Sequence, residues 1–240
     1  MAQGRNNGAH GAKPRRGNAG HGASQSLTDR AYAIIEEMIV TLQLSPGAVL
    51  SESALSEQLD IGRTPIREAL QRLAREGLVV ILPRKGILVS EINPRSQLLL
   101  MEVRRELERL LARTGAIRST ADERRQFQDI ADGMAQAAEN NDEISFMRLD
   151  DALNKLVAEA AHNEYARRAI GLLHGLARRF WYMHYKEAAD LPLAARLHAD
   201  LARCIAEGDP DGAAHASDKL VDYVETFTRA TVDMRGKTKS

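Results

Sequence analysis

The chain has 240 residues, of which 44% are hydrophobic and 28% are charged, and its 33 basic and 33 acidic side chains cancel. This length allows one or two domains with an ample core, and the composition is ordinary for a globular protein. The single cysteine, Cys204, excludes an intramolecular disulfide and a cysteine-based metal site. No apolar run approaches the length of a membrane span and the first residues lack a secretory signal, so we expect a cytoplasmic protein with no membrane partner.

Residues 1–26 are predicted to form a disordered basic arm. They contain four basic residues, no acidic residue and no large apolar side chain after Met1. Such a segment cannot bury enough surface to offset the entropy that it would lose on ordering. A basic arm can reach neighbouring phosphates or the minor groove of DNA, and a passive leader is the alternative.

The first predicted helix covers residues 27–44. Thr28 is the candidate cap, and apolar side chains recur on one face at helical spacing. Pro46 and Gly47 signal a turn that ends this helix, and a short edge strand is predicted at 49–50.

Residues 51–77 predict two short helices joined by a tight turn. Ser51 can cap the first helix, which runs through Leu59. Thr64 is the candidate cap of the second helix, with Pro65 at the first helical position, where its missing N–H costs nothing. The apolar side chains of the second helix share one face: Ile66, Leu70 and Leu73.

The start of this second helix suits a DNA groove. Arg63, Thr64 and Arg67 lie close together there. Backbone N–H groups and Thr64 can bind phosphate, and the arginines can bind phosphate or guanine. A solvated helical pair with surface arginines is the alternative.

A β-hairpin is predicted directly after this helix, with strands at 77–82 and 87–90. Arg84, Lys85 and Gly86 form its basic tip, which can lie against the DNA backbone. An ordinary hairpin with a solvated basic tip is the alternative. The order of helix, helix-turn-helix and hairpin predicts a winged helix over residues 27–92.

The segment PGAVLSESALSEQLDIGRTPIREALQRLAREGLVVILPRKGILV resembles the DNA-binding domain of the GntR family of bacterial transcription regulators. The resemblance implies that Arg63, Thr64, Arg67 and Gly86 touch operator DNA. Ser53 stands where some members carry arginine, and Gly62 stands where many carry serine, so the operator sequence cannot be transferred from a relative. DNA-binding domains of this kind usually bind two half-sites as a dimer, so we expect a homodimer on palindromic double-stranded DNA.

Beyond Pro94 the sequence is predicted to be all α. After a linker at 93–95, with Ser96 as a candidate cap, six helices are expected at 96–117, 121–140, 143–161, 163–187, 192–208 and 210–232, and a disordered tail at 233–240. The predicted fold is therefore mostly α, with a winged helix-turn-helix followed by a six-helix bundle.

This second half resembles the FCD domain, the effector-binding half of the FadR subfamily of GntR regulators. The resemblance rests on VRRELERLLA, LDDALNKLVAEAAHNEY and LHADLARCIAEGDPDGAAHASDKL. It implies an effector-binding and dimerisation domain over 96–232, and six helices in place of seven imply the VanR-type branch.

Asp150 and Asn154 are four residues apart and therefore share a helix face, and His198 lies on a later helix. By resemblance, Asp150 and His198 match two ligands of a divalent metal such as Zn²⁺ in FCD domains. Asn154 and Leu220 stand at the other two ligand positions, and leucine cannot bind a metal. Three interpretations remain open: a reduced metal site that Asn154 helps to form, a metal-free site that binds the effector directly, and a buried Asp–His pair without a ligand.

Arg104 matches an FCD arginine that faces the effector cavity and would bind a carboxylate. The alternative is an exposed arginine paired with Glu108 one turn later. The aromatic stretch 178–184 can line the cavity or fill the core, and we expect the core.

We find no Ser-His-Asp arrangement and no phosphate-binding glycine loop, which weighs against an enzyme. The expected function is a DNA-binding repressor whose operator affinity is set by a small organic-acid effector. The alternatives are a metal-dependent enzyme on a helical bundle and a ligand-independent architectural DNA-binding protein.

Overall fold

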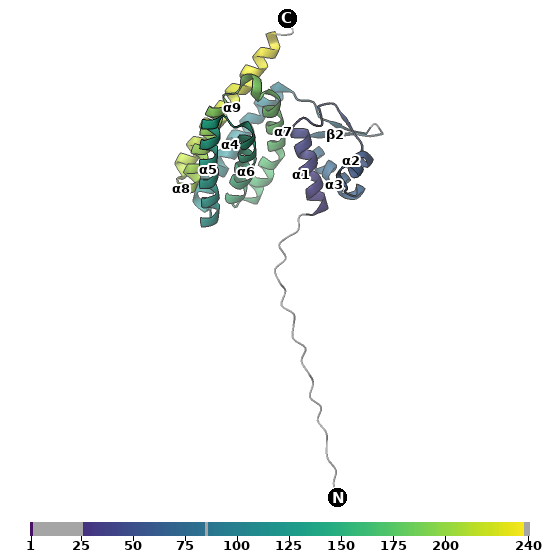
Figure 1. The fold of residues 1–240 in the computed structure, drawn as a ribbon, viewed down its shortest axis with the longest axis horizontal. Coiled ribbons are helices and arrows are strands. Elements are labelled where there is room, and N and C mark those ends of the chain that lie inside the picture. Colours follow the sequence, from purple (N-terminus) through teal and green to yellow (C-terminus); the bar gives the residue numbers. More distant parts are fainter. Residues whose placement is uncertain (2–25, 85, 238–240) are drawn as a thin grey trace.

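The computed structural model describes Met1, residues 26–84 and residues 86–237, which form two lobes (Figure 1). The described part of the N-terminal lobe holds three helices and a small antiparallel sheet, and that of the C-terminal lobe holds six helices. The predicted fold class is therefore confirmed. The predicted disordered arm, apart from its two end residues, lies outside the described residues.

The N-terminal lobe has the predicted winged helix-turn-helix order. Its elements are α1 (Leu27–Val40), β1 (Val49–Leu50), α2 (Glu52–Leu59), α3 (Arg63–Arg75), β2 (Val79–Leu82) and β3 (Gly86–Val89). The strand order is β1-β3-β2, and Val80 of β2 lies opposite Leu88 of β3. The predicted edge strand and hairpin are thus confirmed. The core contains the predicted face of α3 and two residues of α1: Ile66, Leu70, Leu73, Ile35 and Ile39.

The caps of this lobe differ in part from the prediction. Ser51 caps α2 as predicted. The cap of α1 is Ser26, whose Oγ accepts the N–H of Asp29 at 3.0 Å. Thr28 lies inside the helix and its hydroxyl donates to Glu68 at 2.7 Å, so the prediction for Thr28 was wrong. The helix ends at Val40 and not at 44, because the chain turns into the left-handed region at residue 42.

The six helices predicted for the C-terminal lobe are confirmed. They are α4 (Pro94–Arg118), α5 (Ala121–Asn140), α6 (Glu143–Ala160), α7 (Glu164–Ala188), α8 (Leu191–Glu207) and α9 (Pro210–Lys237). The last helix continues five residues beyond the predicted end at 232, into the segment predicted as a disordered tail (233–240). None of the described helices combines the length and the apolar character needed to cross a membrane.

Helix α4 begins earlier than predicted. Asn93 is its cap, because its Oδ1 accepts the N–H of Arg95 at 3.0 Å, and Pro94 occupies the first helical position. Ser96 is therefore part of the first turn and not the cap. Residues 93–95, predicted as a linker, form the cap and the first turn of the helix.

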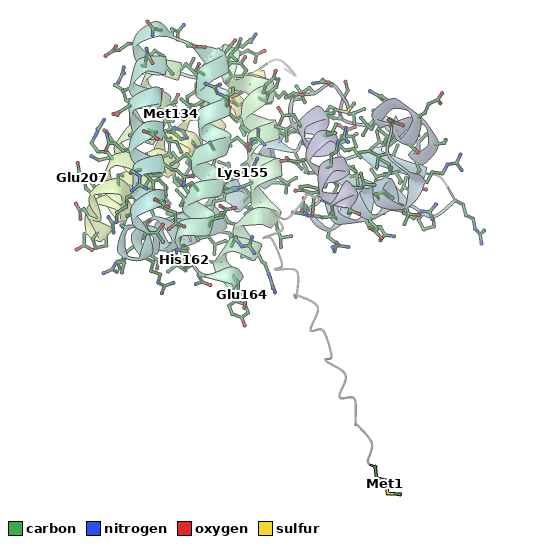
Figure 2. All side chains as sticks on the ribbon, turned by 60° about the horizontal axis from the view of Figure 1, so that its bottom comes forward. Met1, Met134, Lys155, His162, Glu164 and Glu207 are labelled. Atoms are coloured by element: carbon green, nitrogen blue, oxygen red, sulfur yellow. The ribbon has the colours of Figure 1, made fainter. Side chains whose placement is uncertain are left out.

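The bundle has its own apolar core, which includes Phe127, Met134, Phe146 and Leu153. Met134 lies inside this core, whereas Lys155 and Glu164 project from the surface (Figure 2). The alanine-rich facing surfaces of α5 and α8 allow these helices to pack closely. The core therefore does not depend on the N-terminal lobe.

Helix α7 joins the two lobes, because it packs against α1 (Figure 1). A Cβ on Gly175 would lie 2.7 Å from the end of the Leu78 side chain, so any larger residue there would have to displace Leu78. Arg179 is 2% exposed and donates to the backbone oxygen of Ser90 at 2.8 Å. The position of the N-terminal lobe is thus fixed by residues of the C-terminal lobe.

Candidate nucleic-acid interface and ligand cavity

The first turn of α3 carries the residues predicted to meet DNA. The helix begins at Arg63 and its cap is Gly62, so Thr64 is the second helical residue and the prediction of Thr64 as the cap was wrong. Pro65 is the third, where a missing N–H still costs no intrahelical hydrogen bond. No side chain in the described part of the chain caps α3. Its first N–H groups therefore lack a side-chain acceptor, which suits a phosphate oxygen.

Arg63 and Arg67 are four residues apart, and both are exposed. Arg67 makes a two-pronged ion pair with Glu52 of α2, with Nη2 at 2.6 Å and Nε at 3.0 Å. This hydrogen bond and the arginine charge lower the pKa of Glu52. Glu52 therefore holds the guanidinium of Arg67 at the start of the helix, while Arg63 makes no ion pair within the described ranges.

The wing carries the remaining predicted DNA contacts. Arg84 and Gly86 are exposed at the turn between β2 and β3, with φ values of +63° and +102°. Lys85 lies outside the described residues. A φ of +102° is a conformation that glycine adopts without strain, and it brings the hairpin backbone to the surface beside Arg84.

A cavity of about 510 Å³ lies where the two lobes meet. Its walls come from α1, α4, α6, α7, α8 and α9. All four residues predicted to bind an effector line it, as does Leu220: the four are Arg104, Asp150, Asn154 and His198. Helix geometry thus brings together residues that lie up to 94 positions apart (198 minus 104).

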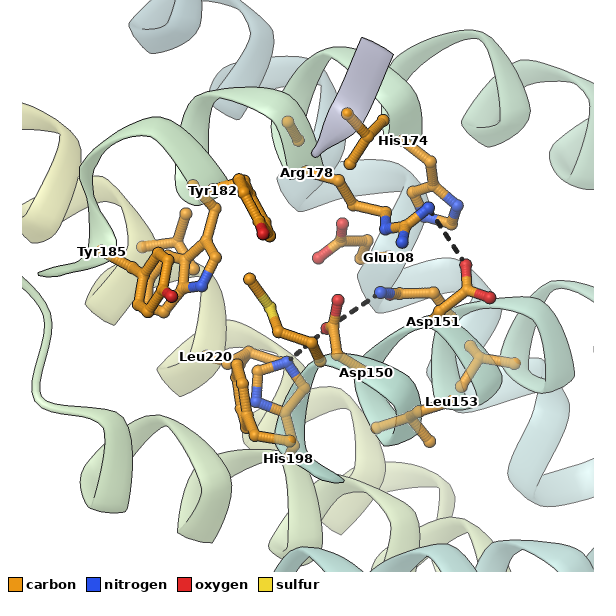
Figure 3. Close-up of a pocket in the computed structure, with 18 of the residues that line it drawn as sticks. Glu108, Asp150, Asp151, Leu153, His174, Arg178, Tyr182, Tyr185, His198 and Leu220 are labelled. Atoms are coloured by element: carbon orange, nitrogen blue, oxygen red, sulfur yellow. Dashed lines mark hydrogen bonds and ion pairs between the residues drawn. The ribbon is translucent and has the colours of Figure 1, made fainter. Parts of the chain in front are cut away.

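Asp150 and His198 form a buried pair in this cavity (Figure 3), with Nε2 of His198 3.0 Å from Oδ1 of Asp150. The other ring nitrogen, Nδ1, lies 2.7 Å from the backbone oxygen of Ala194, so both nitrogens face acceptors. Burial disfavours both charges, but the mutual hydrogen bond and charge prevail. They raise the pKa of His198 and lower that of Asp150. Both shifts favour the charged form of each partner.

These residues do not fit a divalent metal centre. Both ring nitrogens of His198 are already turned towards acceptors, the backbone oxygen of Ala194 and the carboxylate of Asp150. Asn154 presents its amide nitrogen, which donates to Asp150 at 3.0 Å. The fourth position is Leu220, and no group of three metal-binding side chains occurs among the described residues. The donor set favours hydrogen bonding to a ligand over metal binding.

Arg104 lines the cavity and is already paired. Its side chain is 12% exposed, and its Nε and Nη2 atoms lie 2.6 and 2.5 Å from Oε1 of Glu108. Arg104 is thus both a cavity residue and the partner of Glu108, and the exposed position of the alternative interpretation was wrong.

Sequence reasoning missed His174, which lines the cavity from α7, and it expected Arg178 in the core as part of the stretch 178–184. Burial, and then the charge of Arg104, lower the pKa of His174 to about 4, so its imidazole is neutral near pH 7. A signal was present, because residues 174, 178, 181 and 185 recur at helical spacing on one face.

The aromatic stretch 178–184, expected in the core, is divided between two environments. Phe180 is buried, whereas Trp181 and Tyr182 line the cavity. Tyr182 and Tyr185 stand on the same side of the pocket in Figure 3. The cavity thus has an aromatic wall beside its charged wall.

Comparisons with known proteins agree with this arrangement. Residues 27–89 match the family of bacterial regulatory proteins called gntR, and residues 99–223 match the FCD domain. The chain is 27% identical over 206 residues to the HTH-type transcriptional repressor RspR of Escherichia coli strain K12, which covers 86% of this chain and 90% of that protein. It is 26% identical over 209 residues to the probable D-xylose utilization operon transcriptional repressor of Paenarthrobacter nicotinovorans, with 86% and 88% covered.

The fold has a counterpart among solved structures. The structure of E. coli McbR/YncC aligns with a TM-score of 0.72 at 20% identity, and the alignment covers 86% of this chain and 99% of that chain. At this identity the likeness concerns the fold alone.

Proposed function

Because the chain belongs to the GntR family of bacterial regulatory proteins and carries an FCD effector-binding domain, we propose that it is a repressor that a small organic acid releases from its operator. The observation that carries the proposal is the cavity whose walls come from both lobes. A ligand that prefers one arrangement of the lobes changes operator affinity by its differential binding energy.

In this proposal residues 27–92 bind operator DNA. Arg63, Thr64 and Arg67 enter the major groove with the first turn of α3. The wing residues Arg84, Lys85 and Gly86 lie against the backbone of the duplex. The exposure of the described members of this set supports the assignment.

The effector then binds in this cavity, mostly against residues 96–232 and without a metal. Arg104 and His198 supply positive charge, while Asp150 and Asn154 supply hydrogen-bonding groups. An organic acid suits this set because guanidinium and carboxylate groups pair with two hydrogen bonds.

We further propose a homodimer on a palindromic operator. Helix α4 exposes a row of apolar side chains at seven- and four-residue spacing: Leu99, Val103, Leu110 and Ile117, which are 66, 53, 43 and 61% exposed. A second copy of the chain is the occupant that also explains paired half-sites. Sedimentation of the full chain should give a dimer, and Leu110→Glu should give a monomer. A monomeric wild-type chain would refute this assignment. Because a bacterial regulator must reach its DNA, we propose that the protein acts in the cytoplasm.

The alternative of an enzyme that uses Asp150 and His198 has less support. A general base needs a free lone pair within reach of the substrate, and both nitrogens of His198 are engaged with acceptors. We therefore propose that the Asp150–His198 pair holds the cavity together and is not a catalytic pair.

The test uses the full-length protein and DNA that it selects from a random duplex pool. Acetate, succinate and citrate are screened by thermal shift and then added to the DNA complex. We expect at least one acid to raise Tm and to weaken DNA binding. Selective DNA binding that no acid changes would favour the architectural alternative, and turnover of an acid would favour the enzyme.

A further inference from the structure

The cavity includes part of the DNA-binding lobe itself. Glu37, Val40 and Thr41 belong to α1, and they line the same space as Asp150 and His198. A ligand at this end of the cavity can therefore contact both lobes directly. Its effect on DNA binding needs no relay through the bundle core.

Arg178 is the charged residue at this junction. It lies on α7, its side chain is 17% exposed, and it pairs with carboxylates of two neighbouring helices. Its Nη1 lies 3.2 Å from Asp151 of α6 and 3.4 Å from Glu36 of α1, and its Nη2 lies 3.4 Å from Glu37 of α1. Figure 3 shows Arg178 reaching from α7 toward Asp151, beside His174.

The charge of the lining determines how an acid can enter. Five carboxylates face the cavity, namely Glu37, Glu108, Glu143, Asp150 and Asp151, against three arginines, namely Arg104, Arg148 and Arg178. Arg148 is exposed, and water screens its charge. Both largely buried arginines are already paired. An acid group that pairs with either buried arginine must therefore compete with a carboxylate that the arginine already holds.

The two buried arginines differ in what such an exchange would release. Arg104 is held tightly by Glu108, at 2.5 and 2.6 Å, and both belong to α4. Arg178 has three looser partners at 3.2 to 3.4 Å, and two of them belong to α1. Exchange at Arg104 rearranges one helix, whereas exchange at Arg178 breaks a contact between the lobes.

We propose that the acid group of the effector binds Arg178 and thereby takes it from Glu36 and Glu37, so that α1 and the DNA-binding lobe are released from α7. The proposal rests on the proposed function and specifies how the same cavity regulates DNA binding.

Loss of the Arg178 ion pair should release α1 from α7 because Glu36 has no second partner within the described ranges. Its side chain is 16% exposed, and Arg178 is its only ion-paired or hydrogen-bonded partner within the described ranges. Burial raises the pKa of Glu36, and the charge of Arg178 opposes this rise. A buried carboxylate that loses its countercharge is strongly unfavourable. The interface relieves this cost by opening and hydrating Glu36.

The first experiment substitutes Arg178 in the full-length chain. Arg178→Met is compared with Arg168→Met, a matched control that removes an exposed arginine of the same helix paired with Glu164. Binding of acetate, succinate and citrate is measured by calorimetry, and amide exchange of α1 is measured without acid. We expect Arg178→Met to weaken binding of the responsive acid by about tenfold or more and to speed exchange in α1. The control should match the wild type in both measurements.

The second experiment removes the competing carboxylates. Glu36→Gln/Glu37→Gln should bind the responsive acid at least as tightly as the wild type, because the acid no longer competes with them. The ratio of DNA affinities without and with acid should fall toward one. Glu164→Gln is the matched control and should keep the wild-type ratio.

The outcomes separate this proposal from the proposed function. If Arg178→Met binds the acid normally while Arg104→Met does not, or if the double variant keeps the full DNA response, exchange at Arg178 is rejected and an acid-regulated repressor remains. If none of the three acids binds the wild-type chain, both acid regulation and exchange at Arg178 are rejected.

Discussion

In the N-terminal lobe, Arg63 and Arg67 are exposed on the first turns of α3, whereas in the C-terminal lobe Arg104 and Arg178 are largely buried among carboxylates. Exposed charges stay hydrated, and a surface ion pair such as that of Arg67 with Glu52 contributes little to folding, so these arginines remain available to DNA. Buried charges persist only because each has a partner. Substitutions of these charged residues should therefore affect binding alone in the first lobe, and both binding and stability in the second.

The largest expected effect comes from breaking the buried pair of the cavity. Asp150→Ala removes the countercharge of His198, whose ring lies 3.0 Å away and is largely buried. We expect the free energy of unfolding to fall by about 3 kcal/mol, measured by urea denaturation. Asp129→Ala, which removes an exposed aspartate of α5, should change it by less than about 0.5 kcal/mol.

A double variant tests whether pairing is the cause. Asp150→Leu/His198→Leu replaces both charges with apolar side chains and should recover part of the lost stability. If Asp150→Ala is as stable as Asp129→Ala, the buried charges of this lobe do not depend on pairing and the contrast between the lobes fails.

The second effect is a dependence of stability on pH that arises from His174. Its folded-state pKa of about 4 lies below the unfolded value, because burial and Arg104 disfavour the imidazolium. The unfolded chain therefore binds a proton more readily, and stability falls as pH drops from about 6.5 toward 4.

Between pH 7 and pH 5 this loss should reach about 2 kcal/mol, and His174→Met should lack it. The comparison is the difference in unfolding free energy between the two pH values, for each chain. His215→Met removes an exposed imidazole and serves as the control. Equal pH dependence in wild type and His174→Met would mean that His174 is hydrated.

The third effect concerns DNA and leaves the fold intact. Arg63→Ala should weaken binding to the selected duplex by about tenfold, because an arginine at the start of a recognition helix contacts phosphate or guanine. Its free energy of unfolding should stay within about 0.5 kcal/mol of the wild type. Arg75→Ala, at the other end of α3, is the matched control. Equal DNA affinities of the two variants would remove Arg63 from the interface.

Sequence reasoning predicted the helices and strands better than it predicted the helix caps, and the reason is physical. The helices, the hairpin and the buried face of α3 follow from local periodicity and turn residues, so Ser51, Ile66 and Leu70 were placed correctly. Helix starts depend on small shifts that packing decides, and Thr28 and Thr64 were misassigned for that reason.

The cavity could be predicted only in part. Arg104, Asp150, Asn154 and His198 do line one space, as the resemblance implied. The role of Arg178 was missed because it depends on Glu36, 142 positions earlier, and no local pattern encodes such a pair. Pairing across lobes is a property of the packed structure, whereas an exposed arginine on a recognition helix is a property of the segment.

The fourth effect tests the wing. Gly86→Ala places a Cβ at φ +102°, a conformation that is strained for alanine, so stability should fall by about 1 kcal/mol. Gly171→Ala is the contrast, because that helical position has open space around it and alanine should stabilise α7 by up to about 1 kcal/mol. Effects of the same sign would show that backbone strain does not set the cost at Gly86.

The smallest effect on stability is expected for Thr64→Ala, and it distinguishes two roles for this residue. As a helix cap, Thr64 would contribute about 1 kcal/mol to folding. As the second residue of α3 it caps nothing, so the free energy of unfolding should change by less than about 0.5 kcal/mol. Binding to the selected duplex should still weaken several-fold, because the hydroxyl can donate a hydrogen bond to a DNA phosphate. A variant that loses stability but keeps DNA affinity would make Thr64 structural, and the exposed polar residues of the N-terminal lobe would then resemble the paired residues of the cavity.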